Sequence, residues 1–230
     1  MARSNKVSRK ELLKEPDQIL TRSRRLFAFI LTHRSKVLIA LGGLFAITLV
    51  ATGFQFFAER QEARAFALLE DGREQFRTAS RGQPAAEAYA AVRPHFESLI
   101  SDHGNRNGGR LARLVFADMA LRAADFDKAA ELYSRALKDF GDDPALRDLV
   151  LSGLAHAHDG KGAPEAALPY FERIAAGKDA FLKDDALFQL GRIHRDMGNL
   201  EKSRENFERL LEEFPDFVHA ELVRERLGRS

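Results

Sequence analysis

The stretch from Val37 to Phe57 constrains the fold more than any other part of the sequence. It contains 21 residues without a charge or a proline, and its polar side chains are limited to Thr48, Thr52 and Gln55. At a rise of about 1.5 Å per residue, such a helix is roughly 31 Å long, which matches the roughly 30 Å hydrocarbon layer of a bilayer. A core helix of a soluble protein normally keeps a polar stripe. The sequence therefore predicts one transmembrane helix over residues 37–57.

A cleaved signal peptide is the main alternative, because it also has a basic region followed by an apolar run. Its apolar run usually has only about 7–15 residues. Here the basic region is 36 residues long, and no small-x-small cleavage site follows the apolar run before Glu59. These features favour an uncleaved anchor.

The charge is distributed unevenly around this segment. Residues 1–36 carry ten basic and three acidic residues, a net charge of +7, whereas the rest of the chain carries 26 basic and 31 acidic residues, a net charge of −5. The positive-inside rule then places the N-terminus in the cytoplasm and residues 58–230 on the other side. In a bacterium with two membranes, this is a single-pass inner-membrane protein with a periplasmic C-terminal domain. The same charge balance argues against a nucleic-acid partner.

The basic cytoplasmic segment, residues 1–36, allows two interpretations. Leucine, isoleucine and phenylalanine alternate with lysine and arginine, which is typical of an amphipathic helix on anionic lipid headgroups. A solvated basic tail that only sets the topology explains the same charges. The sequence does not decide between them.

Beyond residue 58 the composition is typical of helices, and the pattern repeats. The clearest unit is a helical hairpin with Leu187, Leu190, Gly191, Gly198, Asn199, Leu200, Phe207, Leu210 and Pro215. Related patterns place inter-helix turns at Ala124, Gly162 and Gly198, which are 38 and 36 residues apart. Small residues at Ala117, Ala155 and Gly191 fall where the two helices of each hairpin should cross most closely.

These residues resemble the tetratricopeptide repeat family, whose period is about 34 residues. The resemblance implies an all-α fold, with the transmembrane helix followed by an α-solenoid. We expect a periplasmic repeat domain over 58–230, with units at about 59–104, 109–144, 145–177 and 183–215 and an amphipathic terminal helix at 216–230. The chain departs from the family pattern where Ala120, His158 and His194 replace an aromatic residue and where Ser203 replaces alanine.

Two further local features carry predictions. The run from Gly104 to Gly109, with its three glycines and two asparagines, predicts a linker. Pro94 and Pro169 fall inside predicted second helices, which they should break or bend.

The sequence lacks the common catalytic and metal-binding patterns. There is no cysteine, no glycine-rich phosphate loop, no H-E-x-x-H and no G-x-S-x-G. His156 and His158 would point about 200° apart on a helix, so they cannot chelate one ion together. The pairs Asp142-Asp143 and Asp184-Asp185 are better explained as carboxylates at helix starts. We therefore expect no enzyme, no cofactor and no metal site.

The resemblance instead implies a concave groove that binds peptide segments or partner helices. The family's inner-face positions correspond here to Leu114, Asp118, Leu121, Arg122, Ser152, His156, Asp159, Phe188, Arg192 and Arg195. Arg192 and Arg195 lie three residues apart, so they could pair with acidic groups of a partner. For each single residue, a solvated or packing role remains the alternative.

The combination of a basic cytoplasmic segment, one transmembrane helix and a periplasmic repeat domain resembles the ancillary subunit of the bacterial Sec translocon. That resemblance implies partners among translocon subunits, periplasmic chaperones and their clients. The alternative is a structural scaffold for a cell-envelope or division complex, which would use the same groove on one fixed partner.

Overall fold

The computed structural model of the chain describes residues 27–178 and 181–228. Most of the predicted cytoplasmic segment, residues 1–36, therefore lies outside the described residues. The chain divides into two compact units, residues 1–59 and residues 60–230. Helix α2 (Arg34–Ala79) belongs to the first unit up to Glu59 and to the second unit from Arg60 onward.

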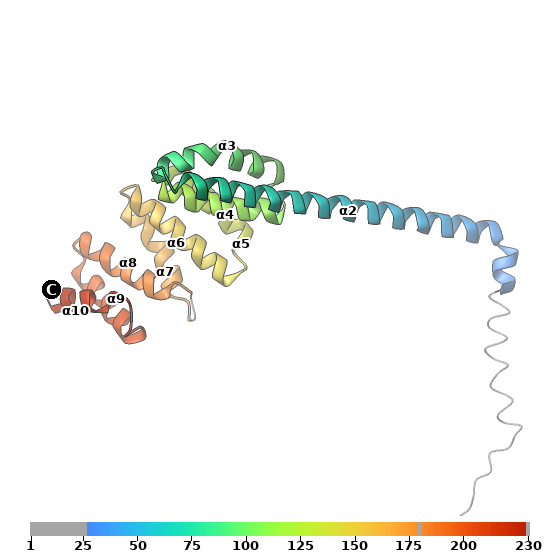
Figure 1. Cartoon of the computed structure of the whole chain (residues 1–230). Coiled ribbons are helices and arrows are strands. Elements are labelled where there is room, and N and C mark those ends of the chain that lie inside the picture. Colours follow the sequence, from blue (N-terminus) through green and yellow to red (C-terminus); the bar gives the residue numbers. More distant parts are fainter. Residues whose placement is uncertain (1–26, 179–180, 229–230) are drawn as a thin grey trace, which may run out of the picture. The chain divides into compact units, whose positions relative to one another are not determined.

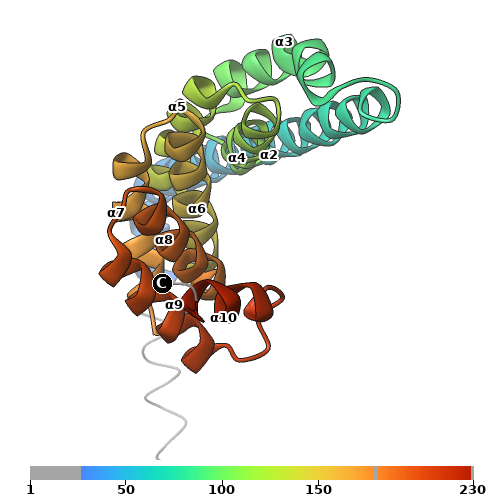
Figure 2. The same ribbon diagram turned by 90° about the vertical axis from the view of Figure 1, so that its left-hand side faces the viewer.

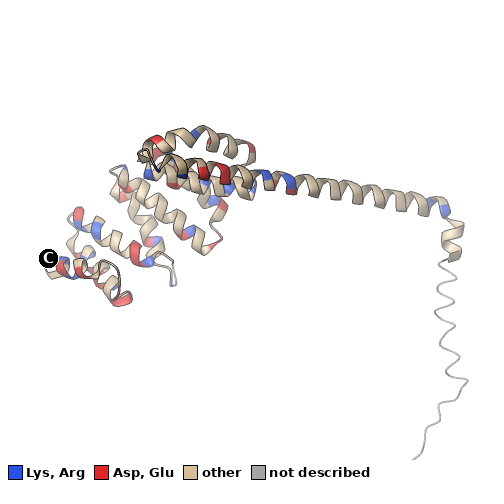
Figure 3. Cartoon of the chain, viewed as in Figure 1, with Lys and Arg blue, Asp and Glu red and all other residues tan. Residues whose placement is uncertain are grey.

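In the first unit, the predicted apolar segment is entirely helical. Every side chain from Leu38 to Phe57 is exposed, and Figure 3 shows this part of α2 without a charged residue. The hydroxyl of Thr48 donates a hydrogen bond to the carbonyl of Leu44 (2.9 Å), so this polar group is satisfied within the helix. Among the described residues, α2 is the one helix long and apolar enough to cross a membrane.

The second unit, residues 60–230, is called the repeat unit below. After the end of α2 it contains α3 (Ala85–His103), α4 (Asn107–Arg122), α5 (Phe126–Phe140), α6 (Pro144–Gly160), α7 (Pro164–Ala175), α8 (Lys183–Asp196), α9 (Leu200–Glu213) and α10 (Ala220–Gly228). Consecutive helices from α3 to α10 pack side by side, and Figures 1 and 2 show them stacked one hairpin on the next. Regular structure in residues 27–178 and 181–228 is helical throughout, which confirms the predicted all-α solenoid.

The three predicted turn positions share one backbone geometry. Ala124, Gly162 and Gly198 have φ angles of 60°, 76° and 81°, and no other described residue has a positive φ. After Ala124, the N–H of Asp125 donates to the carbonyl of Ala120, and the N–H of Ala124 donates to the carbonyl of Leu121. The same pair of bonds recurs at the other two turns. These are Schellman motifs, which end a helix by satisfying its last carbonyls.

Side chains from successive helices form two apolar core clusters. One core cluster is built around Phe96 and Phe116 from α2 to α6, and a second is built around Phe171 and Phe207 from α6 to α10. All four rings are at most 2 % exposed. Burying each large side chain contributes roughly 1.5–3 kcal/mol to folding.

Small residues allow the helices of a hairpin to approach closely, as the sequence predicts. Ala117 and Ala155 are fully buried. A Cβ atom added to Gly191 would lie 2.4 Å from the ring of Phe207, so a larger side chain would push α8 and α9 apart. The hydroxyl of Ser203 donates to the Gly191 carbonyl at the same crossing (2.7 Å). The replacement of alanine at 203 therefore adds a buried hydrogen bond.

Carboxylates begin several of the helices. Asp143 accepts from the N–H groups of Ala145 and Leu146, and Asp184 and Asp185 lie in the first turn of α8. These positions confirm the predicted role of both acidic pairs near helix starts. A carboxylate from another helix caps α4, since Glu62 of α2 accepts from the N–H of Gly108 (2.9 Å).

The predicted linker from Gly104 to Gly109 is wrong in its second half. Helix α4 begins at Asn107, and both Gly108 and Gly109 are buried. A Cβ at Gly108 would lie 2.8 Å from the backbone of Ala65, and one at Gly109 would lie 2.0 Å from the carbonyl oxygen of His103. These glycines allow two backbones to meet closely, and they do not make the chain flexible.

The two prolines do not break their helices. Helix α3 continues through Pro94, and α7 continues through Pro169. Both prolines are exposed, so the backbone carbonyls that lose a hydrogen-bond donor there lie near solvent.

The terminal helix starts later than the sequence predicts, at Ala220. Val223 is fully buried against the second core cluster and Leu227 is partly buried, but Val218 precedes the helix and is 80 % exposed. Val223 and Leu227 therefore cover the end of the stack, and Val218 does not.

Candidate protein-binding groove

A pocket of about 720 Å³ lies between helices α2, α4 and α6. Three of the residues expected in a groove line it, namely Leu114, Asp118 and Arg122 of α4. Their apolar neighbours in the pocket are Phe76, Leu111, Val115, Met119, Leu146 and Leu149. Leu121, which was expected beside them, does not line this pocket; it packs against the first core cluster, to which Leu114 also belongs. We call this site the α2–α4–α6 pocket.

Arginines surround the apolar floor of this pocket. Arg73, Arg77 and Arg81 come from α2 and the turn after it, and Arg122 comes from α4. The guanidinium of Arg122 donates to the carboxylate of Asp118, one helical turn earlier (2.7 Å). The pocket therefore combines apolar surface with a predominantly cationic edge.

Helices α6 and α8 carry a second group of predicted groove residues, but these are joined to each other. Arg192 of α8 forms an ion pair with Asp159 of α6, and it also donates to Gln189 (2.9 Å). His156 lies 3.7 Å from the carboxylate of Asp185. Burial tends to raise the pKa of Asp185, but the contact with His156 and the hydrogen bond from Gln189 (3.3 Å) outweigh it, so the pKa lies below its usual value. We call this set the α6–α8 bridge.

The remaining predicted groove residues are Ser152, Phe188 and Arg195. Ser152 is 7 % exposed inside α6. Phe188 packs against Phe207, Phe217 and His219, and the guanidinium of Arg226 lies 5.7 Å above its ring. Arg195 is exposed and lies 3.8 Å from Asp196. Of the ten predicted residues, Leu114, Asp118 and Arg122 are the three that line the α2–α4–α6 pocket.

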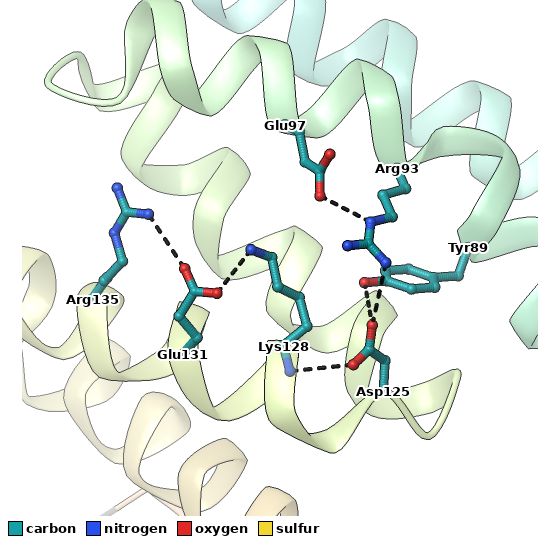
Figure 4. Close-up of polar contacts among 7 residues, drawn as sticks. All are labelled: Tyr89, Arg93, Glu97, Asp125, Lys128, Glu131 and Arg135. Carbon is teal, nitrogen blue, oxygen red and sulfur yellow. Dashed lines mark hydrogen bonds and ion pairs between the residues drawn. The ribbon is translucent and has the colours of Figure 1, made fainter.

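A polar network on α3 and α5, drawn in Figure 4, was not predicted. The hydroxyl of Tyr89 donates to Asp125 (3.0 Å), and the guanidinium of Arg93 lies 3.7 Å from the same carboxylate. Asp125 also accepts from the N–H of Lys128, so one side chain both caps α5 and holds α3. Burial, followed by the contact with Asp125, raises the pKa of Tyr89 above its ordinary value. This network stabilises the contact between two hairpins.

The second half of the network follows α5. Lys128 donates to Glu131 (2.8 Å), and Arg135 lies 3.6 Å from the other oxygen of that carboxylate. The hydrogen bond from Lys128 lowers the pKa of Glu131. Lys128, Glu131 and Arg135 are therefore paired with one another, and a ligand would have to break these ion pairs to bind them.

The histidines of α6 contact different neighbours. His156 meets Phe171 edge to face, whereas His158 stacks on Tyr170. Within residues 27–178 and 181–228, no three side chains of histidine, aspartate or glutamate lie close enough together to hold a metal ion.

Sequence reasoning missed the α2 wall of the pocket. Arg73, Phe76 and Arg77 lie in the unit with the weakest repeat pattern, so no equivalent position in another unit marks them. A usable signal was present, because Phe76 continues the apolar spacing of Ala65 and Leu69 along one face of α2.

One family model matches the chain, and it is described as a tetratricopeptide repeat-like domain over residues 29–228. The matched range contains the apolar segment as well as all the hairpins. No curated protein matches the sequence. The family model covers most of the chain, so the protein belongs to the tetratricopeptide repeat-like domain family.

Proposed function

We propose that this protein is a membrane-anchored interaction module with no catalytic activity of its own, acting as an accessory to the Sec translocon or to periplasmic chaperones. The observation that carries the proposal is the pairing of an exposed, charge-free helix with a tetratricopeptide-like stack. Leaving such a helix in water would be unfavourable, and a bilayer removes that cost. Domains of this family generally mediate protein–protein interactions.

The orientation follows from the flanking charges. Arg34 and Lys36 precede the span, whereas Arg60 and Arg64 after it are offset by Glu59 and Glu62. The positive-inside rule then puts the N-terminus in the cytoplasm and the repeat unit in the periplasm of a two-membrane bacterium. The family model matches from residue 29 onward and so includes the apolar segment. This supports a transmembrane helix that is kept in the mature protein and is not cleaved off as a signal peptide.

Membrane association is tested by alkaline carbonate extraction and by protease treatment of spheroplasts. We expect the protein to stay in the membrane pellet, and added protease to degrade the repeat unit while the bilayer is sealed. A variant with Leu44→Arg and Val50→Arg should lose integration, because each charge costs about 2.5–3.5 kcal/mol at the centre of a span. The matched control is Leu44→Ile with Val50→Ile. Release by carbonate or full protection from protease would contradict the proposal.

Partner identity is tested by quantitative affinity purification of the full chain from solubilised membranes. We expect translocon subunits or periplasmic chaperones to be enriched over a control that carries the span without the repeat unit. Recovery of neither class would contradict an accessory role in translocation.

A photo-crosslinking residue in place of Arg122 separates the two functions that the sequence leaves open. Arg122 is exposed at the edge of the α2–α4–α6 pocket, so the replacement should preserve the fold. Many crosslinked clients indicate a chaperone-like role, whereas one dominant product indicates a scaffold on a fixed partner.

A further inference from the structure

The floor of the α2–α4–α6 pocket is apolar and open to solvent. Leu149 of α6 is 42 % exposed there, and Phe76 of α2 and Val115 of α4 are partly exposed, whereas Leu114 is buried beneath them. Its volume of about 720 Å³ falls in the range of about 300–1,000 Å³ that is typical of ligand sites. Such a pocket takes a few side chains from a peptide segment and is too small for a folded surface.

The charges at its edge restrict what can bind. Arg73 and Arg77 lie 3.5 Å and 2.9 Å from Glu70 and Glu74, but those two glutamates lie outside the pocket lining. Among the described residues, Arg81 has no ion-pair partner, whereas Arg73 and Arg77 do. Among the described residues, four arginines and one acidic residue, Asp118, line the pocket. The site should attract carboxylates and repel lysine and arginine.

The neighbouring α6–α8 bridge is less suited to a charged partner. Arg192 and Asp159 neutralise each other in the α6–α8 bridge, so a carboxylate bound there would have to displace Asp159. A carboxylate that enters the α2–α4–α6 pocket can approach the exposed Arg81 without displacing an ion pair of that arginine.

We propose that the α2–α4–α6 pocket docks a partner segment that presents two or three adjacent bulky apolar side chains next to one or more carboxylates. The apolar side chains lie on Leu149, Phe76 and Val115, and the carboxylates lie toward Arg77 and Arg81. This inference rests on the proposed interaction function. It places the binding site on α2, α4 and α6, and it identifies the ligand as a peptide with both apolar and acidic side chains.

The test uses the full chain in phosphatidylcholine nanodiscs and a bead-displayed octapeptide library. Each library position is Leu, Phe, Ala, Gln, Asp, Glu, Lys or Arg. We expect enrichment of peptides in which an apolar pair lies next to Asp or Glu. The variant Leu149→Ser should weaken binding of the enriched peptides by about tenfold, because a central apolar contact is lost. The control Leu222→Ser changes a leucine of similar exposure on α10 and should leave binding unchanged.

Charge reversal tests the second half of the proposal. Arg81→Glu should lower the ratio of acidic to basic peptides by about fivefold, since one exposed attraction becomes a repulsion. Arg173→Glu, at an exposed arginine of α7 outside the pocket, should leave the ratio unchanged. The thermal midpoint of each variant is measured to show that it is folded.

Three outcomes would overturn the proposal: no enrichment, enrichment of basic peptides, or binding that Leu149→Ser leaves intact. The affinity purification is repeated with the same variants. If membrane partners are still recovered after any of these outcomes, the interaction function stands and the assigned pocket and peptide class are wrong. If no partner is recovered from the unchanged chain, the proposed function fails as well.

Discussion

At the scale of single residues, His194 is the side chain whose protonation should matter most for stability. It is 4 % exposed on α8, and its Nδ1 atom has no hydrogen-bond partner among the described residues. Burial lowers its pKa below the ordinary value of 6.5, with a smaller lowering from Lys202 and opposite contributions from Glu172 and Glu205. The folded state therefore resists protonation of this ring, whereas the unfolded chain does not.

The sign of the pH effect follows from linkage. The unfolded chain binds a proton at 194 as the pH falls through about 6.5, so the free energy of unfolding decreases below that pH and levels off under the folded pKa. We expect a lower thermal midpoint at pH 5.5 than at pH 7.5, and a smaller difference in His194→Phe. His103→Phe is the control and should keep the full difference. An unchanged pH dependence in His194→Phe would contradict this assignment.

The buried glycine at 109 gives a second prediction at this scale. Gly109→Ala should destabilise the repeat unit by about 1–3 kcal/mol, because the new Cβ meets backbone atoms that cannot move away without shifting α3 or α4. Gly82→Ala is the matched control, since a Cβ there meets nothing within 4 Å. Its effect should stay within about 0.5 kcal/mol. Chemical denaturation of both variants measures the difference, and equal stability would mean that the start of α4 is loosely packed.

At the scale of elements, the three Schellman turns differ in one residue. Gly162 and Gly198 adopt a positive φ without steric cost, whereas Ala124 adopts φ 60° with a Cβ. The left-handed conformation costs an alanine roughly 1–2 kcal/mol, and the extra freedom of glycine in the unfolded chain offsets about 0.4–1 kcal/mol of the gain. Ala124→Gly should therefore stabilise the repeat unit by about 0.5–1 kcal/mol.

The reverse change provides the control for this prediction. Gly198→Ala should lower the free energy of unfolding by a similar amount, because Gly198 has open space around it and only its backbone conformation is at issue. Denaturant titrations of both variants provide the measurement. A loss of stability in Ala124→Gly would show that the methyl group of Ala124 contributes more than its backbone strain costs.

The hairpins and their turns could be predicted from sequence because each depends on local residue types at a fixed spacing. Gly162 and Gly198 mark left-handed turns, and Asp143 with Pro144 marks a helix start. The pair Gly108-Gly109 was misread because composition cannot tell a flexible glycine from one that permits close backbone contact. The distinction depends on Ala65 and His103, which lie in other helices or turns.

The candidate site was predicted only in part for a related reason. Helical spacing placed Leu114, Asp118 and Arg122 on one face, and they do share a pocket. Arg192 was expected to meet a partner's carboxylate, but it meets Asp159, which lies 33 residues away on the neighbouring hairpin. The spacing of residues within one helix predicts which side chains share a face, but it does not predict which side chains of a neighbouring helix will contact them.

At the scale of the whole repeat unit, stability should depend on contacts between neighbouring helices. In such arrays each repeat contacts only its neighbours, and terminal helices cover the exposed ends. Helix α10 packs on α9 and contributes the fully buried Val223 to the second core cluster. The first cluster, around Phe96 and Phe116, receives no residue from α10.

Truncation after Pro215 tests this dependence on neighbours. We expect faster amide hydrogen exchange in α8 and α9 with little change in α4 and α5. We also expect a lower thermal midpoint, since removing the buried surface of α10 costs about 2–4 kcal/mol. Leu222→Ser, which changes an exposed side chain of the same helix, is the control. A uniform rise in exchange along all hairpins would indicate that the array unfolds as one cooperative unit.

The turns at 124, 162 and 198 share one geometry, so the chain passes from one helix to the next in the same way at each of them. Each turn leaves one helix and enters the next through the same two backbone hydrogen bonds. A second copy of residues 163–198 could therefore be spliced after Gly198, with both new junctions reproducing a connection that the protein already makes. The lengthened chain would keep its first and last helices unchanged, so the length of the array could be engineered without redesigning either end.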